Sequence, residues 1–349
     1  MMTALFWAAL NVRADGTNLT AAQAWVALTN FAMPTPPMTW ATNPPNEVEL
    51  AKFDDLQAVQ AGAEAERARD FYARFPADPN AARAKVTEVQ ALKMAIRFGA
   101  TNRLAELDSC ERTLLANTNA PEQLRYEIRL DLLGRELQAK EASGANMKME
   151  LEKAARELVQ DFPGGLEGYD ILLDLAADAD LLKMHEFGVL MANSGGPPEL
   201  TELGKGLLRR LDAVGRPLPF DFKTVDGRAV NVTTLSNKVV LVDFWATWCP
   251  ACVALSPRIQ KLYDQFHTNG FEVVGINFDD DTNQAQRYMQ KEGVSWPQYF
   301  GGRGAGNKYG RDYSINVLPS AWLVDRKGIV RDIHAKTDLE AKVGKLMAE

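Results

Sequence analysis

The stretch Val239-Val-Leu-Val-Asp-Phe-Trp-Ala-Thr-Trp-Cys-Pro-Ala-Cys252 decides how the last third of this chain folds. Its first part is a continuous apolar run, which predicts a strand that is buried on both faces. Two residues separate the cysteines, so Cys249 is expected at the start of a helix and Cys252 almost one turn further along. At that separation the two sulfurs can meet and form a disulfide reversibly. The stretch therefore predicts a redox centre.

The two cysteines are expected to have different roles. The unpaired amides and the dipole at a helix N-terminus favour the thiolate, so we predict that Cys249 attacks and Cys252 resolves. A structural disulfide would close too small a loop to stabilise the fold much. A zinc site would need more ligands, and the remaining candidates are scattered without ligand spacing: Cys110, His185, His267 and His334. We expect no metal and no cofactor besides the redox-active disulfide.

The composition is that of a globular protein with two domains. The chain has 349 residues, of which 46% are hydrophobic and 24% charged. The net charge is −7, and the acidic excess lies in residues 1–215. Because no basic stripe is present, nucleic acid and anionic membrane surfaces are poor partners. No stretch approaches the roughly 20 apolar residues of a membrane span.

The first 46 residues resemble a leader followed by a linker. Thr3–Leu10 is apolar, and Val12-Arg-Ala14 has the small-residue spacing of a cleavage site, so residues 1–14 are interpreted as a signal-peptide remnant. This predicts export to the periplasm or cell envelope. If the run is instead a first core helix, the protein is cytoplasmic. Residues 15–46 are rich in Asn, Thr and Pro and are expected to form a linker.

Residues 47–214 predict an all-helical domain. Long Ala-, Leu-, Glu- and Arg-rich periods indicate helices over 48–74, 81–98, 102–116, 121–142 and 147–161, with shorter helices up to 211. Residues 68–76 resemble residues 155–163, and both segments end in Phe-Pro, which is similar to tetratricopeptide-type hairpins. The domain could bind a protein partner on a concave surface, or only support its neighbour. Cys110 is expected to be an inert core thiol, with pairing to Cys249 as the alternative.

Residues 215–349 predict a domain of strands and helices, after the Gly- and Pro-containing boundary at 214–219. Asp226-Gly227 marks a hairpin between strands at 220–223 and 228–232. Further strands are expected at 238–245, 271–277, 321–325 and 329–333, with helices at 251–267, 283–292 and 339–347. The Gly-rich segment 301–306 lacks a phosphate-binding ending and is expected to be a loop. The predicted architecture is a multidomain α+β chain: an all-α domain, then a mixed sheet flanked by helices and preceded by a hairpin.

This second domain resembles the thioredoxin superfamily. The resemblance rests on Phe244–Cys252, on Pro257 five residues later, and on Val317-Leu-Pro-Ser320 ahead of a strand. Within this superfamily, the added hairpin at residues 220–232 and the run Lys238–Trp245 resemble those of the exported TlpA/ResA-like thiol:disulfide oxidoreductases. The resemblance covers about residues 215–349, and the first 214 residues have no such match.

The resemblance implies a set of site residues. Pro319 would be cis, would face the cysteines and would present the backbone of Leu318 to an extended substrate. Asp243 matches a buried acid, and burial would raise its pKa and let it accept a proton from Cys252 through a water. Trp248 and Pro250 would border the substrate. Two departures stand out: Leu255 replaces an acid of many relatives, and the dipeptide Pro250-Ala251 leaves the direction of electron flow open.

The function expected from these residues is a thiol:disulfide oxidoreductase. It would exchange disulfides with protein cysteines through its Cys-Pro-Ala-Cys centre and be recharged by an upstream thiol or disulfide donor. One alternative is a thiol peroxidase, although Asp243 and Ala246 stand where that chemistry usually has Pro and Thr. The other is an interaction protein whose helical domain binds partners while the cysteine pair acts as a redox latch.

Overall fold

The computed structural model describes residues 19–177, 179–224, 227–235, 237–302 and 306–349. The predicted signal-peptide remnant, Asp226 of the predicted turn and part of the Gly-rich segment lie outside these residues. The chain divides into two compact units, Met1–Gln138 and Ala139–Glu349. Within the described part of the chain, no helix combines the length and the apolar character needed to cross a membrane.

The first unit is helical. Its core is a cluster of small and apolar side chains from consecutive helices, including Ala65, Leu92, Leu107 and Ile128. The long second helix begins at a capping box in which Asn46 and Glu49 each accept the other's backbone N–H at 3.0 Å. The helices are α1 (Ala21–Thr29), α2 (Glu47–Arg74), α3 (Ala81–Arg97), α4 (Leu104–Leu115) and α5 (Glu122–Ala142), the last of which crosses into the second unit.

The linker predicted for residues 15–46 is wrong in part, because this segment contains α1 and a 3-10 turn at Met38–Ala41. Thr20 and Gln23 form a capping box that starts α1. Leu28 is buried in a cluster with Ala68 and Phe71 of α2. Trp25 of α1 also packs against the Phe71 ring. The helix is therefore held by its cap and by a small apolar contact, and it is too short to show a sustained helical period in the sequence.

The boundary predicted at residue 214 also needs correction. The helices before it are part of the second unit, because their buried side chains share one apolar cluster with the sheet. Tyr169, Phe187 and Leu207 belong to that cluster together with Val242 and Trp322. The Gly-Pro segment at 214–219 thus marks a turn of the chain inside one unit. These helices are α6 (Met147–Asp161), α7 (Glu167–Ala176), α8 (Leu181–Ala192) and α9 (Pro198–Asp212).

The two similar segments, residues 68–76 and 155–163, form the ends of two helices. α2 and α6 both end at a phenylalanine C-cap, Phe75 and Phe162, whose backbone N–H donates to the carbonyl four residues earlier. The equivalent residues Ala68 and Ala155 are both fully buried. A tetratricopeptide-type arrangement stays a prediction.

The C-terminal domain is built on a mixed five-stranded sheet of order β5-β4-β3-β6-β7. β3, β4 and β5 are parallel, and β6 runs antiparallel to β3. β7 pairs antiparallel with β6 and therefore runs in the same direction as β3. β1 and β2 form the predicted hairpin. The strands are β1 (Asp221–Lys223), β2 (Ala229–Asn231), β3 (Val239–Trp245), β4 (Phe271–Asn277), β5 (Gln298–Phe300), β6 (Ser320–Val324) and β7 (Val330–Asp332), and the helices are α10 (Pro250–Phe266), α11 (Thr282–Glu292), α12 (Lys308–Asp312) and α13 (Leu339–Ala348).

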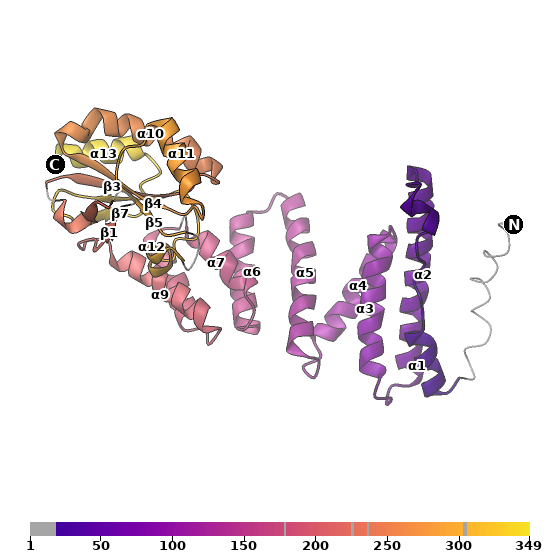
Figure 1. The fold of residues 1–349 in the computed structure, drawn as a ribbon. Coiled ribbons are helices and arrows are strands. Elements are labelled where there is room, and N and C mark those ends of the chain that lie inside the picture. Colours follow the sequence, from indigo (N-terminus) through magenta and orange to yellow (C-terminus); the bar gives the residue numbers. More distant parts are fainter. Residues whose placement is uncertain (1–18, 178, 225–226, 236, 303–305) are drawn as a thin grey trace. The chain divides into compact units, whose positions relative to one another are not determined.

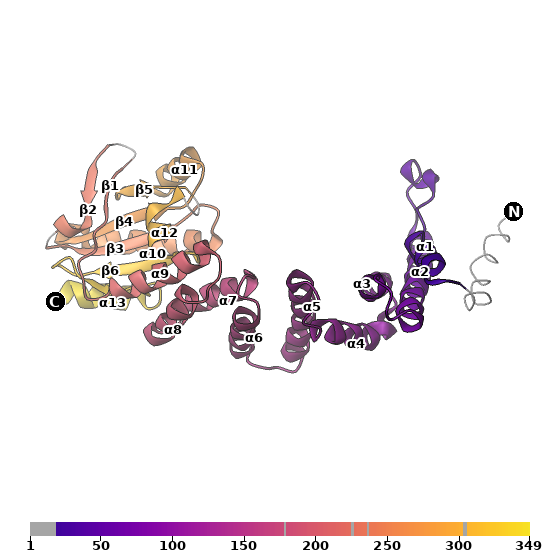
Figure 2. The ribbon, with the colours of Figure 1, turned by 90° about the horizontal axis from the view of Figure 1, so that it is seen from below.

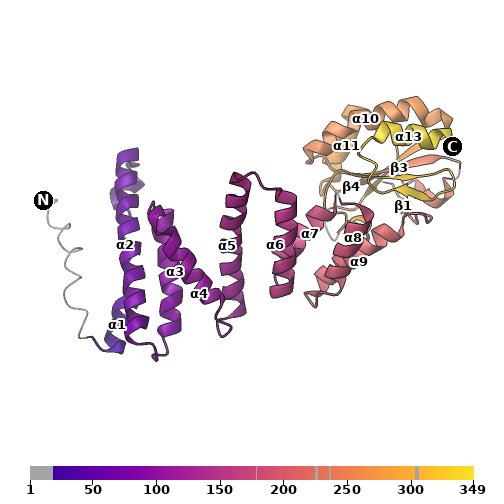
Figure 3. The same ribbon diagram turned by 180° about the vertical axis from the view of Figure 1, so that it is seen from behind.

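The two faces of this sheet are covered by different helices. Side chains alternate along a strand, so Val239 and Leu241 pack with α10 and α13, and Val240 and Val242 pack with α7, α8 and α9. Figures 1 and 3 show α10 and α13 on one side of the sheet and α9 on the other, and Figure 2 shows α7, α8 and α9 next to the strands. The same alternation places Asp243 on the face that α10 covers.

Candidate functional site

The cysteine pair lies where β3 leads into α10. Cys249 is the N-cap of α10, with extended backbone angles, and Pro250 occupies the first helical position, which its fixed φ suits. Cys249 and Cys252 form a disulfide with their Cα atoms 5.2 Å apart. The Cys252 N–H also points at Cys249 Sγ, at 3.1 Å. When the disulfide is reduced, this end of the helix favours the thiolate on Cys249.

Access to the pair is from the side of two exposed neighbours. Cys249 is only 5% exposed and Cys252 4%, so exposure does not distinguish the two sulfurs. Trp248 is 45% exposed, and Pro250 is exposed as well. The Trp248 indole N–H donates to the Phe278 carbonyl at 3.4 Å, which orients the ring. Both chain neighbours of Cys249 are thus open to solvent, and their contact with a substrate stays a prediction.

The segment before β6 approaches the same end of the sheet. The Leu318–Pro319 peptide bond is cis. Ser320 pairs with Phe244 in the antiparallel register of β6 and β3, so Pro319 lies next to the end of β3 that leads to Cys249. Leu318 packs against the apolar cluster that contains both cysteines. The fold thus brings the predicted substrate-binding residues to one edge of the sheet, and their roles stay predictions.

Asp243 is a buried carboxyl group with little compensation. Its side chain is 6% exposed, and Oδ1 has no hydrogen-bond partner among the described residues. Burial raises the pKa of Asp243 to about 7. The residue lies on the face covered by α10, whose buried side includes Cys252 and Leu255. A carboxyl group that titrates near neutral pH on this face can accept or return a proton during exchange.

Leu255 occupies the position where many relatives have an acid. It is 6% exposed and packs with Val239, Leu241 and Ile259 under the sheet. The site therefore has hydrocarbon at this position, and Asp243 is the carboxyl group that this face of β3 offers for proton transfer.

The sequence analysis missed a polar network beside the cysteine loop. Asp279, which is 3% exposed, accepts the Thr247 backbone N–H at 3.0 Å and the Thr247 hydroxyl at 2.6 Å. It also accepts the Asn277 amide at 2.7 Å. The sequence does contain an indication of this network. Asn277-Phe-Asp279 lies at the carboxyl end of β4, which runs parallel to β3, and residues at the carboxyl ends of neighbouring parallel strands lie close together. The network fixes the backbone two residues before Cys249.

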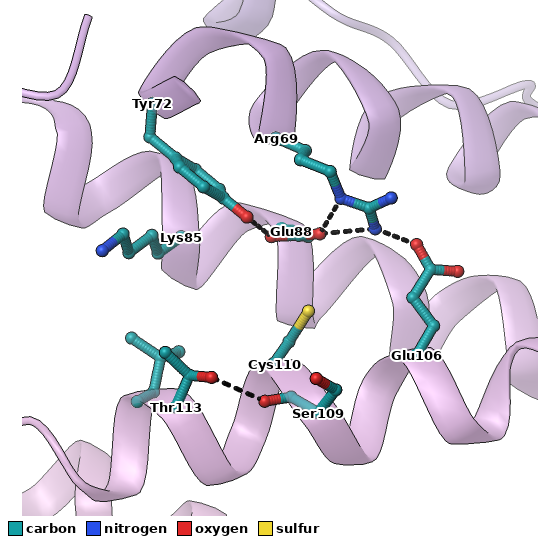
Figure 4. A pocket seen from close by; sticks show the side chains of 9 residues that line it. Arg69, Tyr72, Lys85, Glu88, Glu106, Ser109, Cys110 and Thr113 are labelled. Atoms are coloured by element: carbon teal, nitrogen blue, oxygen red, sulfur yellow. Dashed lines mark hydrogen bonds and ion pairs between the residues drawn. The ribbon is translucent and has the colours of Figure 1, made fainter. Parts of the chain in front are cut away.

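The third cysteine lies in a polar pocket of the first unit (Figure 4). The pocket has a volume of about 430 Å³. Glu88, which is 1% exposed, accepts from the Tyr72 hydroxyl at 2.6 Å and from Arg69 Nε at 2.7 Å. Arg69 also pairs with Glu106. Nowhere in the described ranges do three or more His, Cys, Asp or Glu residues form a group that could hold a metal ion.

The surroundings of Cys110 suppress its reactivity. Figure 4 shows the sulfur pointing toward Glu88. Burial and the Glu88 carboxylate raise the pKa of Cys110 to about 11. At neutral pH the thiol is protonated and a poor nucleophile. Cys110 is only partly buried, so it is not a core residue as predicted, and its inertness stays a prediction.

A mixed sheet, a cysteine pair at the first turn of α10 and a cis-proline before β6 together define a thioredoxin-like domain. Residues 213–347 match the Redoxin family, so the C-terminal part of the chain is a Redoxin domain. The matched region covers the sheet and the cysteine pair and leaves out the helices up to α9.

Curated relatives match the same part of the chain. "Thiol-disulfide oxidoreductase ResA" of Halalkalibacterium halodurans is 27% identical over 128 residues, which are 37% of this chain and 71% of that protein. "Thioredoxin-like protein YneN" of Bacillus subtilis is 28% identical over 34% of this chain and 68% of its own length. "Thiol:disulfide interchange protein DsbE" of Pseudomonas aeruginosa is 31% identical over 34% of this chain and 64% of its own length.

Proposed function

We propose that this chain is a thiol:disulfide oxidoreductase that exchanges disulfides with cysteine-containing proteins. The observation that carries the proposal is the Cys249–Cys252 disulfide at the N-terminus of α10. The names of the curated relatives, thiol-disulfide oxidoreductase and thiol:disulfide interchange protein, support the same chemistry.

In the reducing direction, the Cys249 thiolate attacks one sulfur of a substrate disulfide. The substrate S–S bond breaks, one substrate sulfur leaves as a thiolate that takes up a proton, and a mixed disulfide remains. Cys252 then loses its proton and attacks Cys249 Sγ, which releases the second substrate sulfur. Two electrons have passed to the substrate, and the Cys249–Cys252 disulfide has formed. The reverse sequence oxidises a substrate dithiol.

The surrounding residues support these steps. Asp243, whose pKa burial raises to about 7, would accept the Cys252 proton, through a water if the gap requires one. The backbone of Leu318, beside Pro319, would pair with an extended substrate segment, and Trp248 and Pro250 would border it. Because the dipeptide between the cysteines tunes the reduction potential, its measured value decides between reductant and oxidant.

We further propose that the enzyme works in the cell envelope and is recharged by an upstream thiol or disulfide donor. The support for export is the apolar run Thr3–Leu10 followed by Val12-Arg-Ala14. Cell fractionation of the full-length protein tests the location. Recovery of the unprocessed chain in the cytoplasm would refute it.

The central test is a redox titration of the full chain in glutathione buffers, together with a trapping experiment. A reversible two-electron disulfide is expected. Cys252→Ser should capture substrates as mixed disulfides, and the capture should disappear when Cys249→Ser is added. Peroxide consumption at Cys249 faster than disulfide exchange would favour a thiol peroxidase. Partners bound equally with and without Cys249 would favour an interaction protein.

A further inference from the structure

The segment 312–319, which we call the cis-proline loop, is held by helices outside the matched Redoxin region. Arg209 Nε of α9 donates to the Asp312 carbonyl at 2.8 Å. The Ser314 hydroxyl donates to the Leu203 carbonyl of α9, also at 2.8 Å. The chain positions joined by these two hydrogen bonds are 103 and 111 residues apart. The loop is therefore tied to α9 at its beginning and near its middle.

α7 holds the second half of the loop. Asn316 Nδ2 donates to Asp174 Oδ1 of α7 at 3.4 Å. Asn316 precedes Leu318 by two residues. Ile171 and Leu175 of the same helix pack against the apolar cluster that Leu318 also contacts. The polar contact and the apolar packing act on the residues that lead directly into the cis peptide bond.

A close approach of backbones fixes α9 against the loop. A Cβ atom on Gly206 would lie 2.1 Å from Ser314 Oγ, so the contact requires glycine at this position. Ser314 is 2% exposed and has a φ of 49°, which marks the point where the loop reverses. Any larger side chain at position 206 would push the loop away.

The two helices reach the proline itself. A cavity of about 10 Å³ beside the cis-proline is lined by Pro319, by Ala177 at the end of α7 and by the buried Arg210 of α9. There is no room here for the loop to move toward the helices. The helices thus contact the loop at Asp312, Ser314 and Asn316 and line the cavity beside Pro319.

We propose that α7 and α9 brace the cis-proline loop, so that Asp174, Gly206 and Arg209 are positioning residues for the substrate polypeptide at Leu318. The inference rests on the proposed function. A loop that must become ordered when it binds loses conformational entropy, which weakens binding. Because the helices order the loop beforehand, the substrate backbone meets a preformed edge. The helices before the Redoxin region therefore contribute to substrate recognition.

The test compares a brace variant with a matched control. The double variant Arg209→Ala/Asn316→Ala removes two exposed polar side chains that tie the loop. Lys205→Ala, on the same helix, removes only an exposed residue that pairs with Glu202. Each protein is assayed with two thiol–disulfide partners: a cysteine-containing peptide, which needs the loop, and dithiothreitol, which does not.

The brace variant should lose about fivefold in kcat/KM with the peptide, mainly through KM, while its reaction with dithiothreitol and its reduction potential stay unchanged. Hydrogen exchange at Val317 and Leu318 should also become faster in this variant only. Peptide kinetics equal to those of the parent, or an equal loss with dithiothreitol, would overturn the inference. If the parent itself fails to exchange with either reagent, the proposed function fails instead.

Discussion

Glu88 and Asp243 are buried carboxyl groups of different units, and their environments differ. Glu88 in the first unit is neutralised by Arg69 and accepts a hydrogen bond from Tyr72. Asp243 in the C-terminal domain has no hydrogen bond at Oδ1 among the described residues, and burial raises its pKa to about 7. A compensated carboxylate anchors helices, whereas an uncompensated one changes protonation near neutral pH.

The cysteines differ in the same way. Cys110 lies in the middle of α4, where burial and the Glu88 carboxylate raise its pKa to about 11. Cys249 caps α10, where helix amides favour the thiolate. The same residue type is therefore inert in one place and reactive in the other, and the predictions below test this contrast.

The largest expected effect is on exchange chemistry. Cys249→Ser should reduce thiol–disulfide exchange at least about 1000-fold, because the remaining Cys252 is buried inside α10 and is not at its N-cap, where the helix amides favour a thiolate. Cys110→Ser is the matched control and should keep the parent rate. The measurement is reduction of a disulfide-linked peptide, followed by fluorescence. A large loss of exchange rate in Cys110→Ser would contradict the view that Cys110 is inert and Cys249 reactive.

Asp243→Asn should increase stability in a pH-dependent way. Between about pH 4 and pH 7 the native state keeps a proton that the unfolded state has released, so the free energy of unfolding of the parent falls as pH rises. The variant lacks this fall and should gain up to about 4 kcal/mol at pH 8 and little at pH 4. Urea unfolding of the oxidised parent and variant at pH 4 and pH 8 measures this gain in the free energy of unfolding. A gain that is independent of pH would contradict the assignment to ionisation.

Glu88→Gln should lower the free energy of unfolding, whereas Asp243→Asn should raise it. The change leaves Arg69 and Tyr72 without their shared acceptor charge, and a loss of about 2–3 kcal/mol in the free energy of unfolding of the first unit is expected. Glu136→Gln is the control, since its ion pairs with Arg112 and Arg129 lie nearer the surface and should cost less than about 1 kcal/mol. Equal losses in the two variants would show that burial of Glu88 is not what matters.

The smallest effect concerns the reactivity of Cys110. Glu88→Gln removes the second cause of its raised pKa and leaves burial, the larger cause, in place. Alkylation of Cys110 by iodoacetamide at pH 8 should become severalfold faster under native conditions. Mass spectrometry of the modified residue gives the rate, with Glu106→Gln as a control. An unchanged rate would assign the suppression to burial alone.

The features that could be predicted from the sequence are local ones. The long helices from α2 to α6 and the cysteine pair follow from periods and spacings within one element, and they lie where the sequence indicates. β5 and α12 were missed because each has too few residues to show a period, and both lie near the Gly-rich segment 301–306. Asp279 reaches Thr247 only through the pairing of β3 with β4.

The domain boundary could not be predicted for the same reason. Gly206 and Ser314 meet over more than a hundred residues of chain, so no local pattern reports their contact. The resemblance implied a buried Asp243, which is 6% exposed, yet its lack of compensation depends on what neighbouring strands and helices offer. Those neighbours are fixed only by the complete fold.

The shared core of α7, α8, α9 and the sheet has a consequence for synthesis of the chain. Phe187 and Leu207 leave the ribosome before β3, β4 and β6, which supply the apolar surfaces that bury them. Until Trp322 and its neighbours have been made, these helices expose their apolar faces to the cell. The interval lasts for more than a hundred residues of translation, and throughout it these faces are open to contact with other apolar surfaces.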